Sequence, residues 1–345
     1  MLWHSAGYDV GRPRGGHLSW ASICPHHNLP RRSASSITNM NKKRNLFQPL
    51  ADRGPRNMVA AARLGSRVKQ ARPGHQPATA SLALGCWNVR SLGPQTEATP
   101  SFPRKTALID LELDRLGIQL ASLSETWWYS SGSIKEEHYT IFWNGFENGE
   151  KPKQGVGIAA RNTLLSCVEQ PVFASPRLMS IRIRIRAGYI TVISAYAPTL
   201  LASDEDKDEF YQQLSDLLSS ILAGHDIALL GDFNARIGAD ADSWTSVIGR
   251  FGVGKINENG QRLLELCSLF NLSVASSFFK GSLRSNVMWM HPRSRRWHQL
   301  DHVIIRRRQL RGVKQCRSMH SADRGTDHAL VRCKLQITLK KFHQT

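Results

Sequence analysis

The stretch Ile227-Ala-Leu-Leu-Gly-Asp-Phe-Asn234 is the part of the chain from which the fold can be worked out. Its four apolar residues predict a buried strand, which stops at Gly231. Asp232 and Asn234 follow, one residue apart, at the carboxyl end of that strand. In an extended chain alternate side chains share a face, so both could point into one pocket. The alternative interpretation is a plain turn, because Gly, Asp and Asn all favour turns.

The segments around this stretch predict a layered α/β domain. Residues 82–89 are predicted to form a strand. The next element is a predicted helix that begins at Pro103 and is capped by Gly117. A strand over 118–123 completes one strand–helix–strand unit. Two further helices are expected, one capped by Ser203 and ended by Gly224, the other over 261–270. The remaining predicted strands cover 139–143, 155–161, 178–186, 189–196, 272–275, 287–291, 299–305 and 329–337.

The strand predicted over 178–186 alternates strictly between isoleucine and arginine. Its isoleucines should face the core, and its arginines should lie on the opposite face. The arginine row is either a phosphate-facing stripe or a solvated face, and we prefer the solvated face. The residues concerned are Ile181, Ile183 and Ile185 on one side and Arg182, Arg184 and Arg186 on the other.

Charge divides the chain of 345 residues into two parts. Residues 1–80 hold thirteen Lys and Arg against two acids, and so carry +11 of the net charge of +19. They show little apolar periodicity, which predicts a basic disordered tail. Residues 81–340 should form a single domain. The excess of +8 outside the tail indicates a polyanionic partner, nucleic acid first and an anionic membrane second.

Three features bear on the compartment. The run Lys42-Lys43-Arg44 favours nuclear import, although the tail also has the composition of a mitochondrial presequence or of a plain solvated segment. We predict a nuclear protein, with a cytoplasmic one as the alternative. The six cysteines are scattered without a Cys-x-x-Cys pair, which predicts reduced thiols in an intracellular protein. No apolar run is long enough to span a bilayer, so we expect no membrane partner.

Polar side chains recur where the predicted strands end. Each has an ordinary explanation when taken alone; Asp301, for example, could form a surface ion pair with the nearby run Arg306-Arg307-Arg308. Strand ends on one side of a sheet converge in space, however, so their recurrence predicts one site. The residues are Asn88, Glu125, Tyr196, Asp232, Asn234, Asp301, Asp327 and His328.

Four motifs carry a family resemblance over residues 82–337. They resemble the endonuclease/exonuclease/phosphatase superfamily and, within it, the endonuclease domains of non-LTR retrotransposons. The resemblance implies a four-layer α/β (α+β) sandwich in which helices flank two packed mixed β-sheets. The motifs are Trp87-Asn-Val-Arg-Ser-Leu92, Ser124-Glu-Thr-Trp127, Ala195-Tyr-Ala-Pro198 and Gly231-Asp-Phe-Asn-Ala235.

The chemistry implied by this resemblance is metal-assisted phosphodiester hydrolysis. Glu125 matches the family's ligand for Mg²⁺, for which Mn²⁺ is an alternative. Asn88 would support that metal site or contact the phosphate, and Asp327 matches an acid that in the family can lie at the metal. Such oxygen ligands suit a hard divalent cation.

The resemblance also implies a catalytic set. His328 matches the histidine that contacts the scissile phosphate or acts as a base, and Asp301 matches the carboxylate that orients it. Asp232 would position or deprotonate the attacking water. Asn234 and Tyr196 would donate hydrogen bonds to phosphate oxygens as charge develops on them.

Three positions depart from the pattern of the apurinic endonucleases in this superfamily. Arg90 stands where they carry an acid, and Thr199 stands where they carry an asparagine. His302 replaces the usual aromatic residue after the orienting aspartate. Activity on abasic sites is therefore not predicted.

A basic loop before Asp301 is the candidate substrate-binding segment. It carries Arg293, Arg295, Arg296 and Trp297. Such a loop could track a nucleic-acid strand or enter a groove, or it could be a solvated hairpin tip.

Four hypotheses follow for the function. The first is a DNA endonuclease that nicks one strand and leaves a 3′-hydroxyl. The second is a domesticated module that binds nucleic acid or chromatin with weak or no catalysis. The third is a different chemistry of the superfamily, such as that of an inositol-phosphate phosphatase or an RNA-cleaving relative, and the fourth is a retrotransposon fragment without a host role. The oligomeric state and the target preference stay open.

Overall fold

The computed structural model describes residues 80–93, 104–146, 154–186, 188–322 and 325–337. The basic tail predicted for residues 1–80 lies outside these ranges except for Ala80, which begins the first strand. Pro103, the predicted first residue of a helix, also lies outside them.

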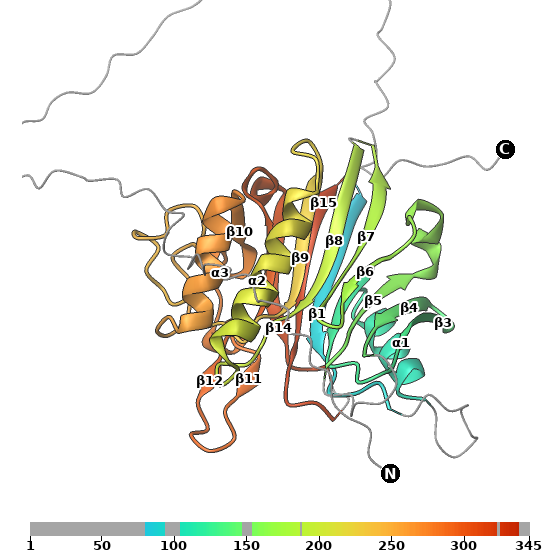
Figure 1. Cartoon of the computed structure of the whole chain (residues 1–345), viewed down its shortest axis with the longest axis horizontal. Coiled ribbons are helices and arrows are strands. Elements are labelled where there is room, and N and C mark those ends of the chain that lie inside the picture. Colours follow the sequence, from blue (N-terminus) through green and yellow to red (C-terminus); the bar gives the residue numbers. More distant parts are fainter. Residues whose placement is uncertain (1–79, 94–103, 147–153, 187, 323–324, 338–345) are drawn as a thin grey trace, which may run out of the picture. The chain divides into compact units, whose positions relative to one another are not determined.

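Two mixed β-sheets form the centre of the described structure (Figure 1). The first has seven strands in the order β14 (Val313–Met319), β15 (Leu330–Ile337), β1 (Ala80–Asn88), β2 (Leu120–Ser124), β5 (Val156–Arg161), β4 (Tyr139–Asn144) and β3 (Ser131–Lys135). The second has six strands in the order β10 (Leu272–Val274), β13 (Asp301–Arg306), β9 (Asp226–Asp232), β8 (Gly188–Tyr196), β7 (Leu178–Ile185) and β6 (Val172–Ser175).

Each sheet contains one parallel pair among antiparallel neighbours. In the first sheet β1 and β2 are parallel, and in the second β8 and β9 are parallel. Antiparallel strands lie beside each pair, with β15 next to β1 and β13 next to β9. The two sheets thus repeat one local arrangement, and the carboxyl ends of all four parallel strands can meet at one edge of the sandwich.

Helices cover the outer faces, which makes four layers and confirms the predicted fold class. Helix α1 (Lys105–Arg115) packs on the seven-stranded sheet, whereas α2 (Asp204–Ser219) and α3 (Glu258–Leu269) pack on the six-stranded sheet. Between the sheets lies the largest apolar cluster. The short elements are η2 (Asn162–Cys167), η3 (Ala275–Phe278), α4 (Leu283–Asn286), η4 (Arg307–Gly312) and the hairpin strands β11 (Trp289–Met290) and β12 (Trp297–His298).

The alternating strand β7 behaves as its sequence predicts. Its isoleucines are buried between the sheets, where they remove apolar surface from water. On the other face Arg182 forms an ion pair with Glu169 at 2.6 Å, and Arg184 lies 3.8 Å from the same carboxylate. Arg182 also covers the ring of Tyr189. These contacts favour the solvated-face interpretation of the arginine row.

The strand β9 continues past the position where the apolar run predicted its end. Gly231 lies inside the strand, between Ala195 of β8 and His302 of β13. Its φ is +152°, and a Cβ atom at this position would lie 1.8 Å from the carbonyl oxygen of Ala195. Only glycine allows the two backbones to approach this closely. The strand therefore reaches Asp232 and delivers it to the sheet edge.

Several predicted element ends and strands were wrong. Helix α2 ends at Ser219 rather than at Gly224, and α3 begins at Glu258 rather than at Gln261. The segment predicted as a strand over 287–291 keeps only two strand residues. Sequence periodicity missed β3, β6 and β14, which are all edge strands. Strands β3 and β6 are exposed along most of their length, and β14 is interrupted by a bulge.

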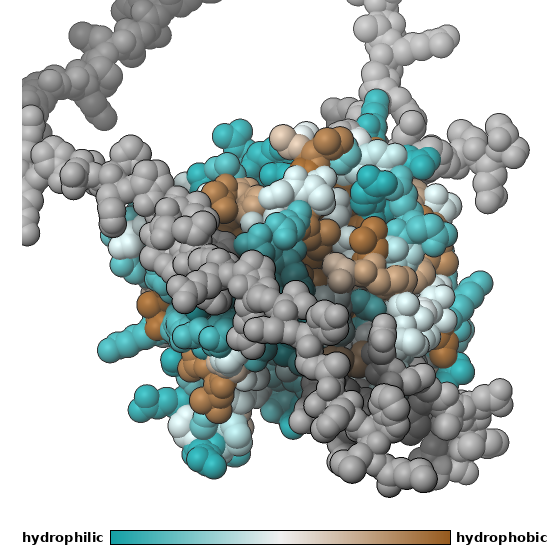
Figure 2. Space-filling model, in the orientation of Figure 1, coloured by the Kyte–Doolittle hydropathy of each residue, from teal (hydrophilic) through white to brown (hydrophobic). Residues whose placement is uncertain are grey.

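The visible face of the described structure is mainly hydrophilic, with apolar side chains in small separate patches (Figure 2). None of the helices in the described ranges is long and apolar enough to cross a membrane. Five cysteines fall in these ranges, and none of them forms a disulfide.

Candidate active site

The polar residues predicted at strand ends do meet at one edge of the sandwich. Tyr196 and Asp232 are the last residues of the paired strands β8 and β9. Asp301 opens the antiparallel strand β13 directly opposite Asp232. On the other sheet Asn88 ends β1, and Glu125 follows β2. His328 lies two residues before β15, which runs antiparallel to β1 and therefore starts at the same edge.

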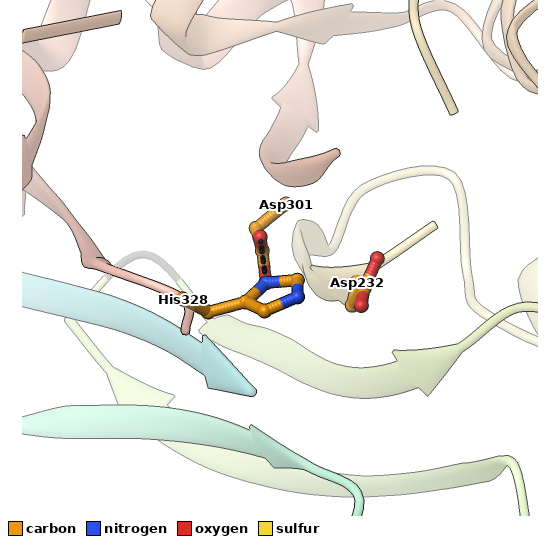
Figure 3. Close-up of side chains that lie close together, drawn as sticks. All are labelled: Asp232, Asp301 and His328. Carbon is orange, nitrogen blue, oxygen red and sulfur yellow. Dashed lines mark hydrogen bonds and ion pairs between the residues drawn. The ribbon is translucent and has the colours of Figure 1, made fainter. Parts of the chain in front are cut away.

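His328 and Asp301 form a buried hydrogen-bonded pair (Figure 3). The Nδ1 atom of His328 lies 2.8 Å from Oδ2 of Asp301, and both side chains are almost fully buried. Burial raises the pKa of Asp301 to about 7, against the opposing charge of His328. Burial alone would lower the pKa of His328, but the charge and hydrogen bond of Asp301 outweigh it and raise that pKa to about 9. The pair therefore favours a protonated imidazole.

The second nitrogen of His328 points toward Asp232 (Figure 3). Ligand atoms of Asp232, Asp301 and His328 all lie within 4.8 Å of one another. Because Asp301 occupies the Nδ1 side of the ring, a substrate approaching from the Asp232 side would meet Nε2.

One amide joins the two carboxylates on the facing sheets. Asn88 donates from Nδ2 to Glu125 Oε1 at 2.7 Å and to Asp232 Oδ2 at 3.0 Å. Tyr196 donates its hydroxyl to the same Glu125 oxygen at 3.0 Å. Burial and the neighbouring charge of Glu125 raise the pKa of Tyr196, so this hydroxyl stays a proton donor at neutral pH. The network fixes both carboxylates at the cleft.

The turn and strand interpretations of the Asp232-Phe-Asn234 segment both hold in part. Asn234 does not continue the strand: its φ is +48°, a left-handed conformation that asparagine tolerates. Its backbone N–H donates to Asp232 Oδ1 at 2.9 Å, and its side chain donates to the carbonyl of Ala197 at 3.1 Å. The expectation that extended geometry brings both side chains to one face was wrong. A side-chain-capped turn brings Asn234 to the cleft instead.

Glu125 also lies in a strained backbone conformation, with φ of +57°. For a residue other than glycine such a conformation costs of order 1 kcal/mol or more, and it recurs at binding and catalytic sites. At this position it turns the chain out of β2 so that the carboxylate meets Asn88 and Tyr196.

These side chains border a cleft of about 610 Å³. Six of the predicted site residues line it, whereas Asn88 and Asp301 lie buried beneath it. The lining residues are Arg90, Glu125, Tyr196, Thr199, Leu200, Leu201, Asp232, Asn234, Arg236, Asn257, Trp289, His291, His298, Leu300, Asp327 and His328.

The donor set at the cleft fits a divalent cation. Glu125 and Asp232 are held close by one neutral amide, and no Lys or Arg contacts either carboxylate among the described residues. The described hydrogen bonds to the Glu125 carboxylate go to Oε1, so Oε2 remains for another ligand. Asp301 Oδ1 is buried without a hydrogen-bond partner among the described residues. This excess of carboxylate oxygen suits a hard cation such as Mg²⁺.

The contacts of Asp327 differ from those of the other predicted metal ligands. Its Oδ2 accepts a hydrogen bond from Trp289 Nε1 at 2.9 Å and lies 3.3 Å from the guanidinium of Arg90. Arg90 therefore balances the charge of Asp327 at the rim of the cleft. Among the acids at the cleft, Glu125 and Asp232 are better placed to hold a cation together, and a metal-binding role of Asp327 stays a prediction.

The predicted basic loop forms the turn between β11 and β12, outside the cleft-lining set. Arg293, Arg295 and Arg296 are exposed on it. Trp297 is partly exposed and packs edge-on against His320. Trp289 at the base of this hairpin forms a bridge to His328, with the two ring centroids 6.1 Å apart. The hairpin is thus attached directly to His328.

Sequence reasoning missed an aromatic group at this base. Trp289 contacts His291 and His298 as well as His328. Burial and the nearby charges of Arg236, His291 and Arg296 lower the pKa of His298. The only available signal was three ring residues next to a basic loop, and two-residue strands have too little periodicity to place them.

Further polar contacts hold the site from below. Ser122 on one sheet and Ser194 on the other share a hydrogen bond of 2.7 Å, and Ser122 also donates to the carbonyl of Leu230. Thr326 donates to the carbonyl of Asn88 at 2.7 Å and accepts from the backbone N–H of His328. These contacts fix the two sheets and the His328 loop relative to one another.

Comparison with known proteins gives consistent matches. The sequence model of the Endonuclease/Exonuclease/phosphatase family matches residues 85–328. Craniofacial development protein 2 of Bos taurus is 29% identical over 266 residues, which cover 76% of this chain and 42% of that protein. The chain therefore spans less than half the length of this curated relative.

Solved structures with the same fold are more distant in sequence. The endonuclease domain of TRAS1, a telomere-specific non-LTR retrotransposon, superposes with a TM-score of 0.50 at 14% identity, covering 75% of this chain and 99% of that domain. The AP endonuclease LMAP from Leishmania major superposes with a TM-score of 0.54 at 13% identity, covering 74% of this chain and 88% of that one. These likenesses establish the fold.

Proposed function

The chain belongs to the Endonuclease/Exonuclease/phosphatase family, and from that premise we propose that it is a Mg²⁺-dependent DNA endonuclease. It nicks one strand by hydrolysing a phosphodiester bond and leaves a 3′-hydroxyl. The observation that carries the proposal is the Asp301–His328 pair beside the Glu125–Asn88–Asp232 network, at the edge of one cleft. A set of this kind brings together a phosphate-binding donor, a water-orienting carboxylate and a cation site.

The proposed reaction uses these residues in distinct roles. Asp232 orients a water molecule and accepts its proton as the oxygen attacks phosphorus. The bond from phosphorus to the 3′-oxygen breaks, and the leaving oxygen takes up a proton from solvent, so the products are a 3′-hydroxyl and a 5′-phosphate. His328, protonated and oriented by Asp301, donates a hydrogen bond from Nε2 to a non-bridging oxygen as negative charge builds up there.

Two further donors support the phosphate. Tyr196 keeps its proton because burial and Glu125 raise its pKa, and Asn234 also lines the cleft. Glu125 and Asp232, steadied by Asn88, would hold Mg²⁺ or Mn²⁺. When bound, that cation supplies positive charge to the transferring phosphoryl group and to the leaving oxygen.

DNA is the proposed substrate because the chain is basic and its cleft is bordered by a basic hairpin. Arg293, Arg295 and Arg296 are exposed beside the cleft, and no acid pairs with them among the described residues. Arginine contacts to phosphates give salt-dependent, sequence-tolerant affinity. The relation to TRAS1, whose matched domain is a retrotransposon endonuclease, supports the same substrate class. We further propose that the protein acts in the nucleus.

A second candidate function is a nucleic-acid or chromatin-binding module with weak or no catalysis. The observation in its favour is the Arg90–Asp327 ion pair, which places a cationic side chain against one predicted metal ligand. Such a module would keep the fold and the positive charge while losing cation affinity.

A plasmid assay separates the two. The protein is incubated with supercoiled plasmid and Mg²⁺, beside EDTA and an Asp232→Ala/His328→Ala double variant. Relaxed circles that disappear in both controls support the nuclease. Intact supercoiled plasmid, with salt-sensitive DNA binding retained, overturns it and supports the binding module.

A further inference from the structure

A second concavity lies at the end of the six-stranded sheet away from the active site. It has a volume of about 860 Å³. Four of its lining side chains are arginines, and no acid is among the described residues that line it. The lining residues are Ala223, Asn271, Arg306, Arg307, Arg308, Leu310 and Arg311. We call this feature the arginine cleft.

Strand β13 separates the two clefts. It begins with Asp301 in the active site and ends with Arg306 in the arginine cleft, about 17 Å away at the rise of an extended strand. The α2–β9 connection forms part of the arginine cleft, and in Figure 1 it lies at the end opposite the β11–β12 hairpin. The two concavities therefore open at opposite ends of the sandwich.

Two of the four arginines form hydrogen bonds or ion pairs with nearby parts of the chain. Arg306 donates from Nε to the carbonyl of His225 at 2.8 Å. Arg308 donates to the carbonyls of Ala223 and Gly224 at 2.8 Å and forms an ion pair with Asp226 at 3.0 Å. Burial and the charge of Arg308 lower the pKa of Arg306. These two residues hold the α2–β9 connection in place and form one wall.

The side chains of the other two arginines, Arg307 and Arg311, form no such hydrogen bond or ion pair among the described residues. The backbone N–H of Arg307 is fixed by the carbonyl of Asn271, but its side-chain Nε is buried without a hydrogen-bond partner among the described residues. Arg311 is exposed, and no described acid pairs with it. A buried guanidinium N–H without an acceptor costs free energy, and like charges held together repel. An anion in the cleft would relieve the repulsion among the four guanidinium groups.

We propose that the arginine cleft binds backbone phosphates of a second nucleic-acid segment, distinct from the segment in the active site. Guanidinium groups match phosphate oxygens in a two-pronged geometry, and several together select a multivalent anion. A straight duplex across the active-site edge cannot also reach the opposite end of the sandwich. This inference depends on the proposed function in one respect: it takes nucleic acid as the partner of the chain. It assigns to this chain the ability to join two segments.

The test is a bridging assay with the full chain. One duplex is immobilised, and capture of a second, fluorescent duplex is measured in EDTA so that nothing is cleaved. Arg307→Gln/Arg311→Gln should reduce capture at least tenfold, because it removes both guanidinium groups. Arg317→Gln/Lys334→Gln removes the same charge from exposed positions on β14 and β15 and should leave capture unchanged. Arg307→Lys/Arg311→Lys should restore capture in part.

Two further readouts make the outcome decisive. Nicking of a short duplex by Arg307→Gln/Arg311→Gln should equal wild type, which separates this cleft from the proposed catalytic activity. Equal capture by the Gln variant and wild type overturns the inference. So does a wild type that captures no second duplex but binds inorganic pyrophosphate in calorimetry, with loss of that heat in the Gln variant, because the cleft would then serve a small phosphorylated ligand.

Discussion

Asp301 lies beneath the cleft and contacts His328. It is fully buried, and its hydrogen bond to Nδ1 fixes the tautomer and the orientation of the ring. Asp301→Asn keeps the shape but removes the charge that holds the proton on the imidazole. We expect the single-turnover nicking rate to fall by about 10²–10⁴-fold with little change in DNA affinity. A rate within threefold of wild type would contradict the assigned role of the pair.

Asn88 joins Glu125 to Asp232 without lining the cleft. Asn88→Ala should leave two carboxylates that repel and spread apart, so the Mg²⁺ concentration for half-maximal nicking should rise by about 10–100-fold. The control is Asn144→Ala, which removes a buried amide that donates to the carbonyl of Ser175, away from the cleft. An equal shift in both variants would show a general loss of stability rather than a metal-site effect.

At this scale the sequence predicted where the polar residues lie but not how they are held. Strand ends placed Tyr196, Asp232 and Asp301 at one edge, since Tyr196 and Asp232 end the parallel strands β8 and β9, and Asp301 begins the antiparallel strand β13 beside them. The left-handed turn at Asn234 and the Arg90–Asp327 ion pair depend on contacts with distant segments. No local pattern encodes such contacts, so they became visible only in the folded chain.

Among the elements, β9 depends on one glycine. Gly231→Ala places a methyl group against the carbonyl oxygen of Ala195 and should cost about 3 kcal/mol or more of unfolding free energy. Gly224→Ala is the matched control, because its Cβ would meet nothing within 4 Å. Urea denaturation of both variants measures the difference. Equal midpoints would show that β8 and β9 do not approach each other as described.

Helix α1 is joined to strand β4 by a histidine and an aspartate. Asp110 accepts hydrogen bonds from Nδ1 of His138 and from the backbone N–H of Tyr139, and the bond to the imidazole raises the pKa of His138. Because the folded pKa lies above the unfolded value near 6.5, this contact stabilises fully below about pH 6.5. The stabilisation is lost as pH rises through the raised folded value.

The measurement is the urea midpoint of wild type and His138→Gln between pH 5 and 9. The gap between the two midpoints should be widest at the acid end and should narrow as pH rises. A difference in urea midpoint that grows with pH would contradict the stabilising contact between Asp110 and protonated His138.

Elements with strong periodicity were predicted well, and elements held by their neighbours were not. Strand β7 alternates from Ile181 onward, and its bounds were predicted within one residue. Strand β14 has a bulge between Val313 and Gln315, which breaks the period of two on which the prediction depends. The two-residue strands β11 and β12 pair with each other, and the bridge between Trp289 and His328 connects them to the rest of the fold.

For the whole molecule, the distribution of positive charge should govern DNA affinity. Arg293→Gln/Arg295→Gln/Arg296→Gln should weaken binding and reduce the slope of log K against log salt by about 0.9 for each phosphate that the variant no longer neutralises. Arg182→Gln/Arg184→Gln/Arg186→Gln removes equal charge from β7 and the residue that follows it, and two of these arginines already contact Glu169. Electrophoretic shifts at several salt concentrations measure both. If the two variants weaken DNA binding equally, the arginine row at Arg182, Arg184 and Arg186 contacts phosphate and is not simply a solvated face.

The activity that we propose for the active-site cleft is hydrolysis of one DNA strand, which leaves a 3′-hydroxyl. The direct measurement is incorporation of labelled nucleotide by a DNA polymerase, added to plasmid that has been treated with the protein and Mg²⁺. We predict incorporation at nicks made by wild type, without prior phosphatase treatment, and none with Asp232→Ala/His328→Ala. Plasmid that stays supercoiled, or nicks that prime synthesis only after a phosphatase, would contradict the account.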